Sequence, residues 1–184
     1  MYKSKKSNSA LIIGLTGNIG SGKSLALKKL KRDGFFTISA DEVVKKAYSE
    51  KGEFYDGVVN LFGTIDSKII LENEALWDEL DDLTKKFIVP KIFDLIDDNL
   101  NKVKFIVVEI PLLFEFDLDA CFDVLVLVTS SVERFNKTYQ KIKNRQICDA
   151  NKIATCDFVV YNNMSKASFL KKIDYLEKKL KAYV

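Results

Sequence analysis

The sequence contains no histidine, so the commonest nitrogen ligand of protein metal sites is missing. Its cysteines, Cys121, Cys148 and Cys156, form no Cys-x-x-Cys pair and have no histidine companions, so neither a zinc site nor a disulfide framework is expected. No apolar run approaches the roughly 20 residues that a membrane-spanning helix needs. The run Ala10–Leu15 is also too short for the core of a signal peptide. We therefore expect a cytoplasmic protein with reduced thiols and no membrane partner.

Neither sign of charge dominates the chain. Lysine and arginine total 29 residues against 26 acidic residues, which gives a net charge of +3. A protein that binds nucleic acid usually carries a strong basic patch, so nucleic acid is not an expected partner. Hydrophobic residues make up 47% and charged residues 30%, as in a typical globular protein. The length of 184 residues favours one domain with an inserted substructure over two full domains.

Short apolar runs rich in Val, Ile, Leu and Phe predict strands that are buried on both faces. These runs are Ala10–Leu15, Phe35–Ser39, Lys104–Ile110, Asp123–Thr129 and Asp157–Tyr161. Lysine-rich segments with helical spacing lie between them, such as Leu25–Arg32, which is followed by the helix-ending Gly34. Strands that alternate with helices predict an α/β fold with a five-stranded parallel sheet flanked by helices.

The long interval 41–101 contains no convincing strand and instead has apolar residues at helical spacing. Examples are Leu76, Leu80, Leu83 and Phe87, which precede Pro90. We expect a helical insertion at about residues 42–101 within a single domain that covers 1–184. A second apolar series predicts a C-terminal amphipathic helix packed on the sheet, in preference to a membrane or partner helix. Its members are Phe169, Ile173, Leu176 and Leu180.

Residues 17–24 read Gly-Asn-Ile-Gly-Ser-Gly-Lys-Ser, which matches the Walker A pattern at every fixed position. The segment follows a predicted strand and precedes a predicted helix, as that pattern requires. Its glycines allow successive backbone N–H groups to point at phosphate oxygens, and the helix N-terminus adds partial positive charge. A glycine-rich turn with an accidental Gly-Lys-Ser is the alternative interpretation.

This P-loop predicts ATP and Mg²⁺ as ligands. Lys23 can reach the β and γ phosphates, and the hydroxyl of Ser24 can ligate the magnesium ion. The predicted nucleotide-binding residues are Gly17, Asn18, Ile19, Gly20, Ser21, Gly22, Lys23, Ser24 and Leu25.

A Walker A pattern alone does not choose among kinases, ATPases and GTPases. A GTPase needs an Asn-Lys-x-Asp motif, but Asn151-Lys152 has no aspartate two residues later. A nucleoside kinase would be favoured by Asp-Arg-Ser or Glu-Arg-Ser, whereas Glu133-Arg134 is followed by Phe135. A kinase that acts on another small molecule fits the chain better.

Three segments, in their order and spacing, resemble dephospho-coenzyme A kinases: Gly14–Ser24, Ile38–Asp41 and Glu109–Glu115. The stretch Pro-Leu-Leu-Phe-Glu within the third is the most discriminating. A fourth match consists of Gln146, Lys152, Asp157 and Asn162. The resemblance implies transfer of the ATP γ-phosphoryl group to the ribose 3′-hydroxyl of dephospho-coenzyme A, the last step of coenzyme A synthesis.

The resemblance also implies roles for residues outside the P-loop. Asp41 stands at the position of the family's catalytic base, at the end of the second strand. We expect that strand to lie beside the P-loop strand. Alternatively, Asp41 only caps a helix that begins at Glu42. Glu109 would orient the magnesium ion, or else be a solvated strand end. The acceptor side would be lined by Pro111, Leu112 and Leu113, although an apolar run after a buried strand is also ordinary core.

The sequence departs from the family in two regions. Ser67 and Val89 stand where the family usually has Arg and His, both in the region expected to hold the acceptor. The lid, at about residues 130–146, is shorter than usual, and Lys137 stands at the position of the arginine in the lid of the family. Other cations of the segment could substitute for it: Arg134, Lys141, Lys143 and Arg145.

Three interpretations therefore remain open. The first is a dephospho-coenzyme A kinase, with Lys23, Asp41 and Lys137 as catalytic residues. The second is a P-loop kinase for another hydroxyl acceptor, and the third is a nucleotide-binding relative that has lost catalysis. A relative that has lost catalysis would be expected to lose its P-loop first. The P-loop is intact, which favours an active kinase.

Overall fold

The computed structural model describes residues 10–131 and 146–183. Its strands form one sheet in the order β2-β3-β1-β4-β5, and the pairs of β1 with β3, β1 with β4 and β4 with β5 are parallel. The strands are β1 (Leu11–Thr16), β2 (Phe36–Ser39), β3 (Phe105–Glu109), β4 (Val124–Thr129) and β5 (Phe158–Tyr161). All five predicted strands are confirmed, and each bound lies within one residue of its prediction.

The order of the strands corrects one expectation about the sheet. We predicted the second strand beside the P-loop strand, but β3 lies between β1 and β2. In the observed register, Ile13 of β1 is the partner of Val107 on one side and Val124 on the other. β1 therefore lies at the centre of the sheet, where both of its neighbours follow it in the sequence by about a hundred residues.

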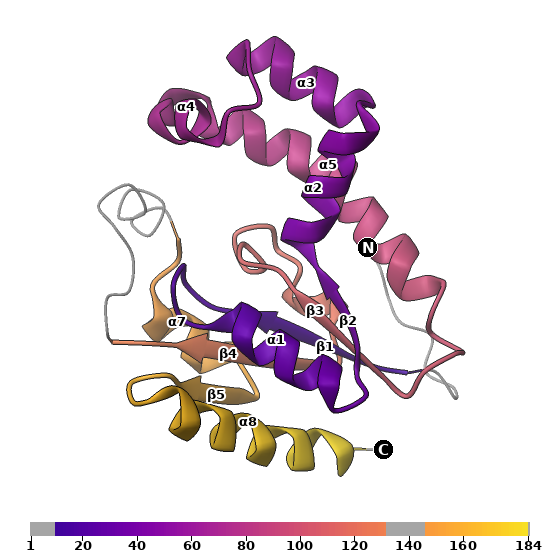
Figure 1. The fold of residues 1–184 in the computed structure, drawn as a ribbon, viewed down its shortest axis with the longest axis vertical. Coiled ribbons are helices and arrows are strands. Elements are labelled where there is room, and N and C mark those ends of the chain that lie inside the picture. The colour runs from indigo at the N-terminus through magenta and orange to yellow at the C-terminus, as the bar shows by residue number, and fades with distance from the viewer. Residues whose placement is uncertain (1–9, 132–145, 184) are drawn as a thin grey trace. The chain divides into compact units, whose positions relative to one another are not determined.

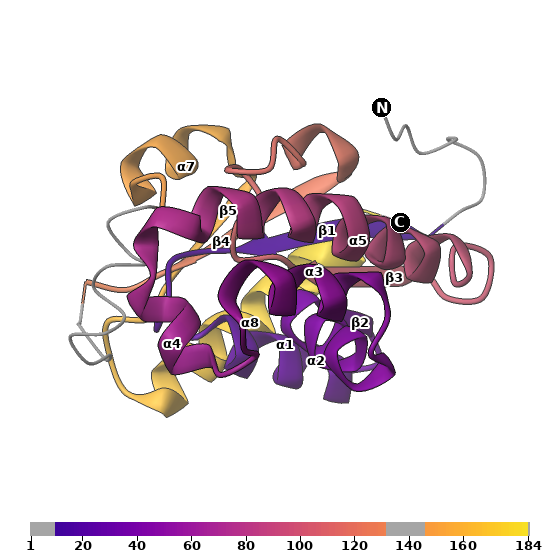
Figure 2. The ribbon, with the colours of Figure 1, turned by 90° about the horizontal axis from the view of Figure 1, so that it is seen from above.

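The helices that pack on this sheet cover both of its faces. α1 (Lys23–Arg32) and α8 (Lys166–Lys181) lie side by side on one face, and α7 (Asp149–Thr155) lies on the other together with the β3–β4 connection (Figures 1 and 2). That connection includes a short 3₁₀ helix, Asp119–Cys121. Placement of helices on both faces is the usual arrangement for a parallel sheet.

The core between the sheet and the pair α1 and α8 explains the apolar patterns of the sequence. All six residues of β4 are buried, as is every residue of β1 after Leu11. The predicted apolar face of α8 is confirmed, because Phe169, Ile173, Leu176 and Leu180 are all buried. The edge strands differ from the prediction of full burial: Tyr161 in β5 is 46% exposed, because an edge strand has a neighbour on one side only.

The chain divides into two compact units: Ser39–Asp98 forms the second, and the rest of the described chain belongs to the first. The sequence predicted the helical insertion at about 42–101. After Ser39, the end of β2, the unit is helical. Its helices are α2 (Ala40–Glu50), α3 (Glu53–Phe62), α4 (Ser67–Glu72) and α5 (Trp77–Asp97), with a 3₁₀ turn at Glu74–Leu76.

Packing within this unit depends on close contact of α3 with α5. A Cβ atom on Gly57 would lie 2.9 Å from the end of the Leu83 side chain, so a larger residue at this position of α3 would require Leu83 to move. Helix α5 continues through Pro90, which normally costs about 3 kcal/mol in a helix interior. Burial of Ile88, Ile92 and Ile96 on either side of the proline offsets this cost.

Across residues 10–131 and 146–183, none of the helices combines the length and the apolar character needed to cross a bilayer.

Candidate active site

The loop after β1 has a backbone that only glycine can supply at two positions. Gly17 has a φ of 141°, and a Cβ atom there would lie 2.0 Å from the carbonyl oxygen of Val128 in β4. Gly22 has a φ of 108°, and its Cβ would lie 2.4 Å from Nδ2 of Asn162, which follows β5. The loop is therefore fitted against the ends of both strands, and any side chain at these two positions would displace it.

Helix α1 begins at the end of this loop and leaves its N-terminus available to an anion. Its N-cap, Gly22, makes no side-chain cap, and the first turn contains no acidic residue. The unpaired N–H groups of a first helical turn and the helix dipole both favour a bound phosphate. The geometry of residues 17–24 thus agrees with the phosphate-binding loop that the sequence predicts.

The side chain of Lys23 is folded back onto the loop. Its Nζ donates to the carbonyl oxygens of Gly17, at 2.7 Å, and Asn18, at 3.0 Å. The residue is only 7% exposed. The ammonium group therefore lies within the loop whose backbone would surround a phosphate group.

Ser24 and Glu109 lie together at the mouth of the loop. The hydroxyl of Ser24 donates to Oε1 of Glu109 at 3.4 Å, and Glu109 is the last residue of β3 and 3% exposed. Hydroxyl and carboxylate oxygens are ligands that Mg²⁺ accepts. The structure thus brings together the two residues that the sequence predicts for the metal, and their chemistry fits that ion.

Residues from the C-terminal third of the chain hold the loop in place. Oε1 of Gln146 accepts from Ile19 N at 3.2 Å, Nδ2 of Asn162 donates to Ser21 O at 2.8 Å, and Nζ of Lys152 donates to Asn18 Oδ1 at 3.3 Å. The sequence analysis placed these three residues in a family pattern but assigned them no role. Their position next to a strand or at a helix face gives no sign of such distant partners.

The residues after β3 divide into one buried side chain and two that keep some exposed surface. Pro111 and Leu112 are half-buried, and the carbonyl oxygen of Pro111 accepts a hydrogen bond from Thr16 Oγ1 at 3.3 Å. Leu113 is fully buried, and its side chain lies so close to Gly14 that a Cβ there would be 2.9 Å from it. Leu113 therefore packs in the core against β1 and presents no surface to a ligand in this structure.

Comparison with known proteins decides the family. Residues 11–168 match the family model described as dephospho-CoA kinase. The chain belongs to the dephospho-CoA kinase family. Two curated members are similar to it over most of their length: that of Fusobacterium nucleatum is 30% identical over 90% of this chain and 96% of its own, and that of Rickettsia bellii is 29% identical over 90% and 95%.

Solved structures agree with this fold. A dephospho-CoA kinase from Campylobacter jejuni superposes with a TM-score of 0.65 at 20% identity, over 94% of this chain and 98% of that one. A shikimate kinase from Acinetobacter baumannii gives a TM-score of 0.51 at 13% identity, over 92% and 93%. The predicted P-loop kinase fold is confirmed.

Membership of the dephospho-CoA kinase family also confirms the predicted class of enzyme, an ATP-dependent phosphotransferase. ATP is therefore a substrate of this enzyme. The magnesium ion, the acceptor and the roles of single residues remain predictions.

Asp41, the position of the family's base, lies two residues after the end of β2 and is exposed. The predicted helix start at Glu42 is wrong. Helix α2 begins at Ala40, and the extended residue Ser39 occupies the N-cap position. Asp41 is therefore inside the first turn. There its negative charge interacts favourably with the helix dipole, but the residue does not cap the helix.

Most of the predicted lid lies outside the described residues, which resume at Gln146. This applies to Lys137 and to the cations that could replace it, Arg134, Lys141, Lys143 and Arg145. Of the two other departures from the dephospho-CoA kinase pattern, Ser67 is the exposed first residue of α4 and Val89 is half-buried in α5.

Proposed function

We propose that this chain is a catalytically active dephospho-CoA kinase, which transfers the γ-phosphoryl group of ATP to the ribose 3′-hydroxyl of dephospho-CoA. The observation that carries the proposal is the pairing of Ser24 with Glu109, at 3.4 Å, beside an intact phosphate-binding loop. A relative that had lost catalysis would be under no constraint to keep this pair. The names of its relatives support the choice of acceptor.

Ser24 and Glu109 are the residues that would hold Mg²⁺. The hydroxyl of Ser24 would be a direct ligand, and the buried carboxylate of Glu109 would orient the ion or its waters from the end of β3. When bound, the ion neutralises charge on the transferred phosphoryl group. The exposed position of Ser24, in the first turn of α1, leaves its oxygen accessible for this role.

Lys23 would change partners when ATP binds. Its ammonium group now donates to carbonyl oxygens of Gly17 and Asn18. Phosphate oxygens carry a full negative charge, whereas these carbonyl oxygens carry only a partial one, so the ammonium group is attracted more strongly to the phosphates. Lys23 would therefore move to the β and γ phosphates and stabilise the charge that shifts between them during transfer.

The acceptor side would be formed by residues that the family pattern indicates. Asp41 would accept the proton of the 3′-hydroxyl as general base. Pro111 and Leu112, which retain surface, would contact the acceptor. The helical unit Ser39–Asp98 would bind the rest of that molecule, and Lys137 would add positive charge over the phosphoryl group.

The test is a magnesium-dependent ATP assay with dephospho-CoA beside adenosine and deoxynucleosides. We expect coenzyme A to form from the first substrate only, with the new phosphate on the 3′-oxygen by NMR. Product from a nucleoside would assign the chain to another acceptor. ATP binding without product from any acceptor would identify a relative that has lost catalysis.

A further inference from the structure

A buried lysine outside the P-loop contacts that loop directly. Lys152, in α7, is 1% exposed and is among the largest fully buried side chains of the described chain. An ammonium group in a protein interior is strongly destabilising unless it is paired and hydrogen-bonded. The partners of Lys152 therefore indicate why the protein keeps this group.

Lys152 connects three segments that are distant in the sequence. Its Nζ forms an ion pair with Oε1 of Glu115, in the β3–β4 connection, at 3.0 Å. It also donates to Oδ1 of Asn18, in the P-loop, at 3.3 Å. The same Glu115 oxygen accepts from the backbone N–H of Ile147 at 2.8 Å, so Glu115 is itself held in position.

Asn18 is the residue on which two lysines converge. Its backbone oxygen accepts from Lys23 at 3.0 Å, while its side-chain oxygen accepts from Lys152 at 3.3 Å. The backbone of Asn18 and the flanking N–H of Ile19, which is held by Gln146, form the outer half of the loop. A restraint on the Asn18 side chain therefore restrains this outer half of the loop, Asn18 and Ile19.

We propose that Lys152 is a positioning residue for ATP binding: it fixes Asn18, and through it the outer half of the P-loop, in the phosphate-binding conformation. Glu115 serves as its counter-charge. A loop that is already ordered loses less conformational entropy when it binds its ligand, so the restraint increases ATP affinity. The inference rests on the proposed nucleotide site but not on the identity of the acceptor.

The first measurement is the affinity of the purified full chain for magnesium ATP, by titration calorimetry without any acceptor. Lys152→Met keeps the length of the side chain and removes its charge. Loss of a hydrogen bond from a charged donor corresponds to about a tenfold or greater change in affinity, and we expect about a tenfold rise in the dissociation constant. In steady state, the Michaelis constant for ATP should rise more than the turnover number falls, because the loop is positioned for binding.

A double-mutant cycle tests whether the effect passes through Asn18. Asn18→Ala removes the oxygen that Lys152 contacts. If the proposal is right, Lys152→Met in the Asn18→Ala background should change ATP affinity by less than about twofold, since the restraint is already absent. A full tenfold effect in both backgrounds would overturn the proposal.

The cost of an unpaired Glu115 must be separated from the effect on the loop. Glu115→Gln combined with Lys152→Met removes both charges, and we expect its thermal stability to exceed that of Lys152→Met alone while ATP affinity stays low. If ATP affinity recovers together with stability, Lys152 is only structural and the proposal is wrong.

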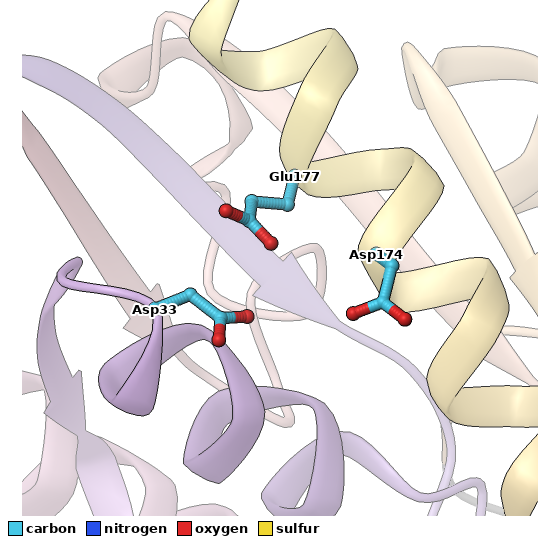
Figure 3. Close-up of side chains that lie close together, drawn as sticks. All are labelled: Asp33, Asp174 and Glu177. Atoms are coloured by element: carbon cyan, nitrogen blue, oxygen red, sulfur yellow. The ribbon is translucent and has the colours of Figure 1, made fainter.

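Lys29 supplies the matched control. Figure 3 shows three carboxylates that lie close together, two from α8 (Asp174 and Glu177) and one, Asp33, just after α1; Lys29 forms ion pairs with them. Its Nζ is 2.5 Å from Asp33 and 2.5 Å from Asp174, so this cluster already contains a cation and ties α1 to α8. Lys29→Met should lower thermal stability and leave ATP affinity within about twofold of wild type. An equal loss of affinity in Lys29→Met would show that loss of any ion pair has this effect, and would reject the special role of Lys152.

This design separates the inference from the proposed function. If coenzyme A is never formed but the cycle on ATP affinity behaves as expected, only the proposed function fails. If coenzyme A is formed and the cycle shows no coupling, only the role of Lys152 fails.

Discussion

Replacement of Gly22 by alanine should destabilise the protein by two separable effects. The first is backbone strain, because its φ of 108° is one that residues with a side chain rarely adopt, at a cost of about 1–3 kcal/mol. The second is steric. The new methyl group would lie 2.4 Å from Nδ2 of Asn162, which must then move and give up its 2.8 Å hydrogen bond to Ser21 O. Asn162 is 2% exposed, so loss of that bond costs about a further 1–3 kcal/mol.

Gly34 is the matched control for this substitution. Its φ is 92°, but no heavy atom lies within 4 Å of the place where a Cβ would be. Gly34→Ala should therefore cost only the strain, and the gap between the two variants should be about 1–3 kcal/mol. Both substitutions restrict the unfolded chain equally, so that contribution cancels in the comparison.

The assay is urea unfolding followed by circular dichroism, with the slope of the transition compared among variants to check that they unfold alike. In an Asn162→Ala background the obstacle is gone, so Gly22→Ala should cost no more there than Gly34→Ala does in wild type. The reasoning is refuted if Gly22→Ala and Gly34→Ala are equally destabilising in wild type, or if Asn162→Ala leaves the cost of Gly22→Ala unchanged.

Three further predictions concern single residues. Lys23→Ala should abolish turnover and leave the circular dichroism spectrum unchanged, because its ammonium group is needed by the phosphates; wild-type activity in this variant would disprove the P-loop assignment. Asp41→Asn should lower the turnover number by about 10²- to 10⁴-fold with little change in ATP affinity, as expected for loss of a general base; an unchanged turnover number would leave Asp41 with a structural role. At pH 8, iodoacetamide should modify the exposed Cys148 before Cys156, because burial and then the charge of Asp157 raise the pKa of the Cys156 thiol to about 11; equal rates by mass spectrometry of tryptic peptides would contradict this.

The features that could be predicted from the sequence are those determined by neighbouring residues. An unbroken apolar run such as Val124–Thr129 predicts a buried strand, and all six of its residues are buried. The P-loop was likewise predictable, because Gly17 and Gly22 have positive φ values that few other residues tolerate. These signals are local, so a single sequence is enough to detect them.

The errors arose where distant packing decides the outcome. The sheet places β3 between β1 and β2, and no local pattern determines which strand occupies that position. With Asp41 as its cap, helix α2 was predicted to start at Glu42. It starts two residues earlier, at Ala40, because Ser39 has the extended backbone of an N-cap. The contact between Asn18 and Lys152 joins residues 134 positions apart and could not be inferred from periodicity.

The same long-range contacts have a consequence for synthesis of the protein on the ribosome. The glycine-rich segment is translated more than a hundred residues before the groups that hold it, Gln146, Lys152 and Asn162. Gly17 also packs closely against the backbone of Val128. A nascent chain that ends before Gln146 therefore contains the P-loop residues without the hydrogen-bond partners that hold them in position. Domains generally fold as units during synthesis, and here the predicted ATP-binding loop has all of these contacts only when Asn162, which follows β5, has left the ribosome.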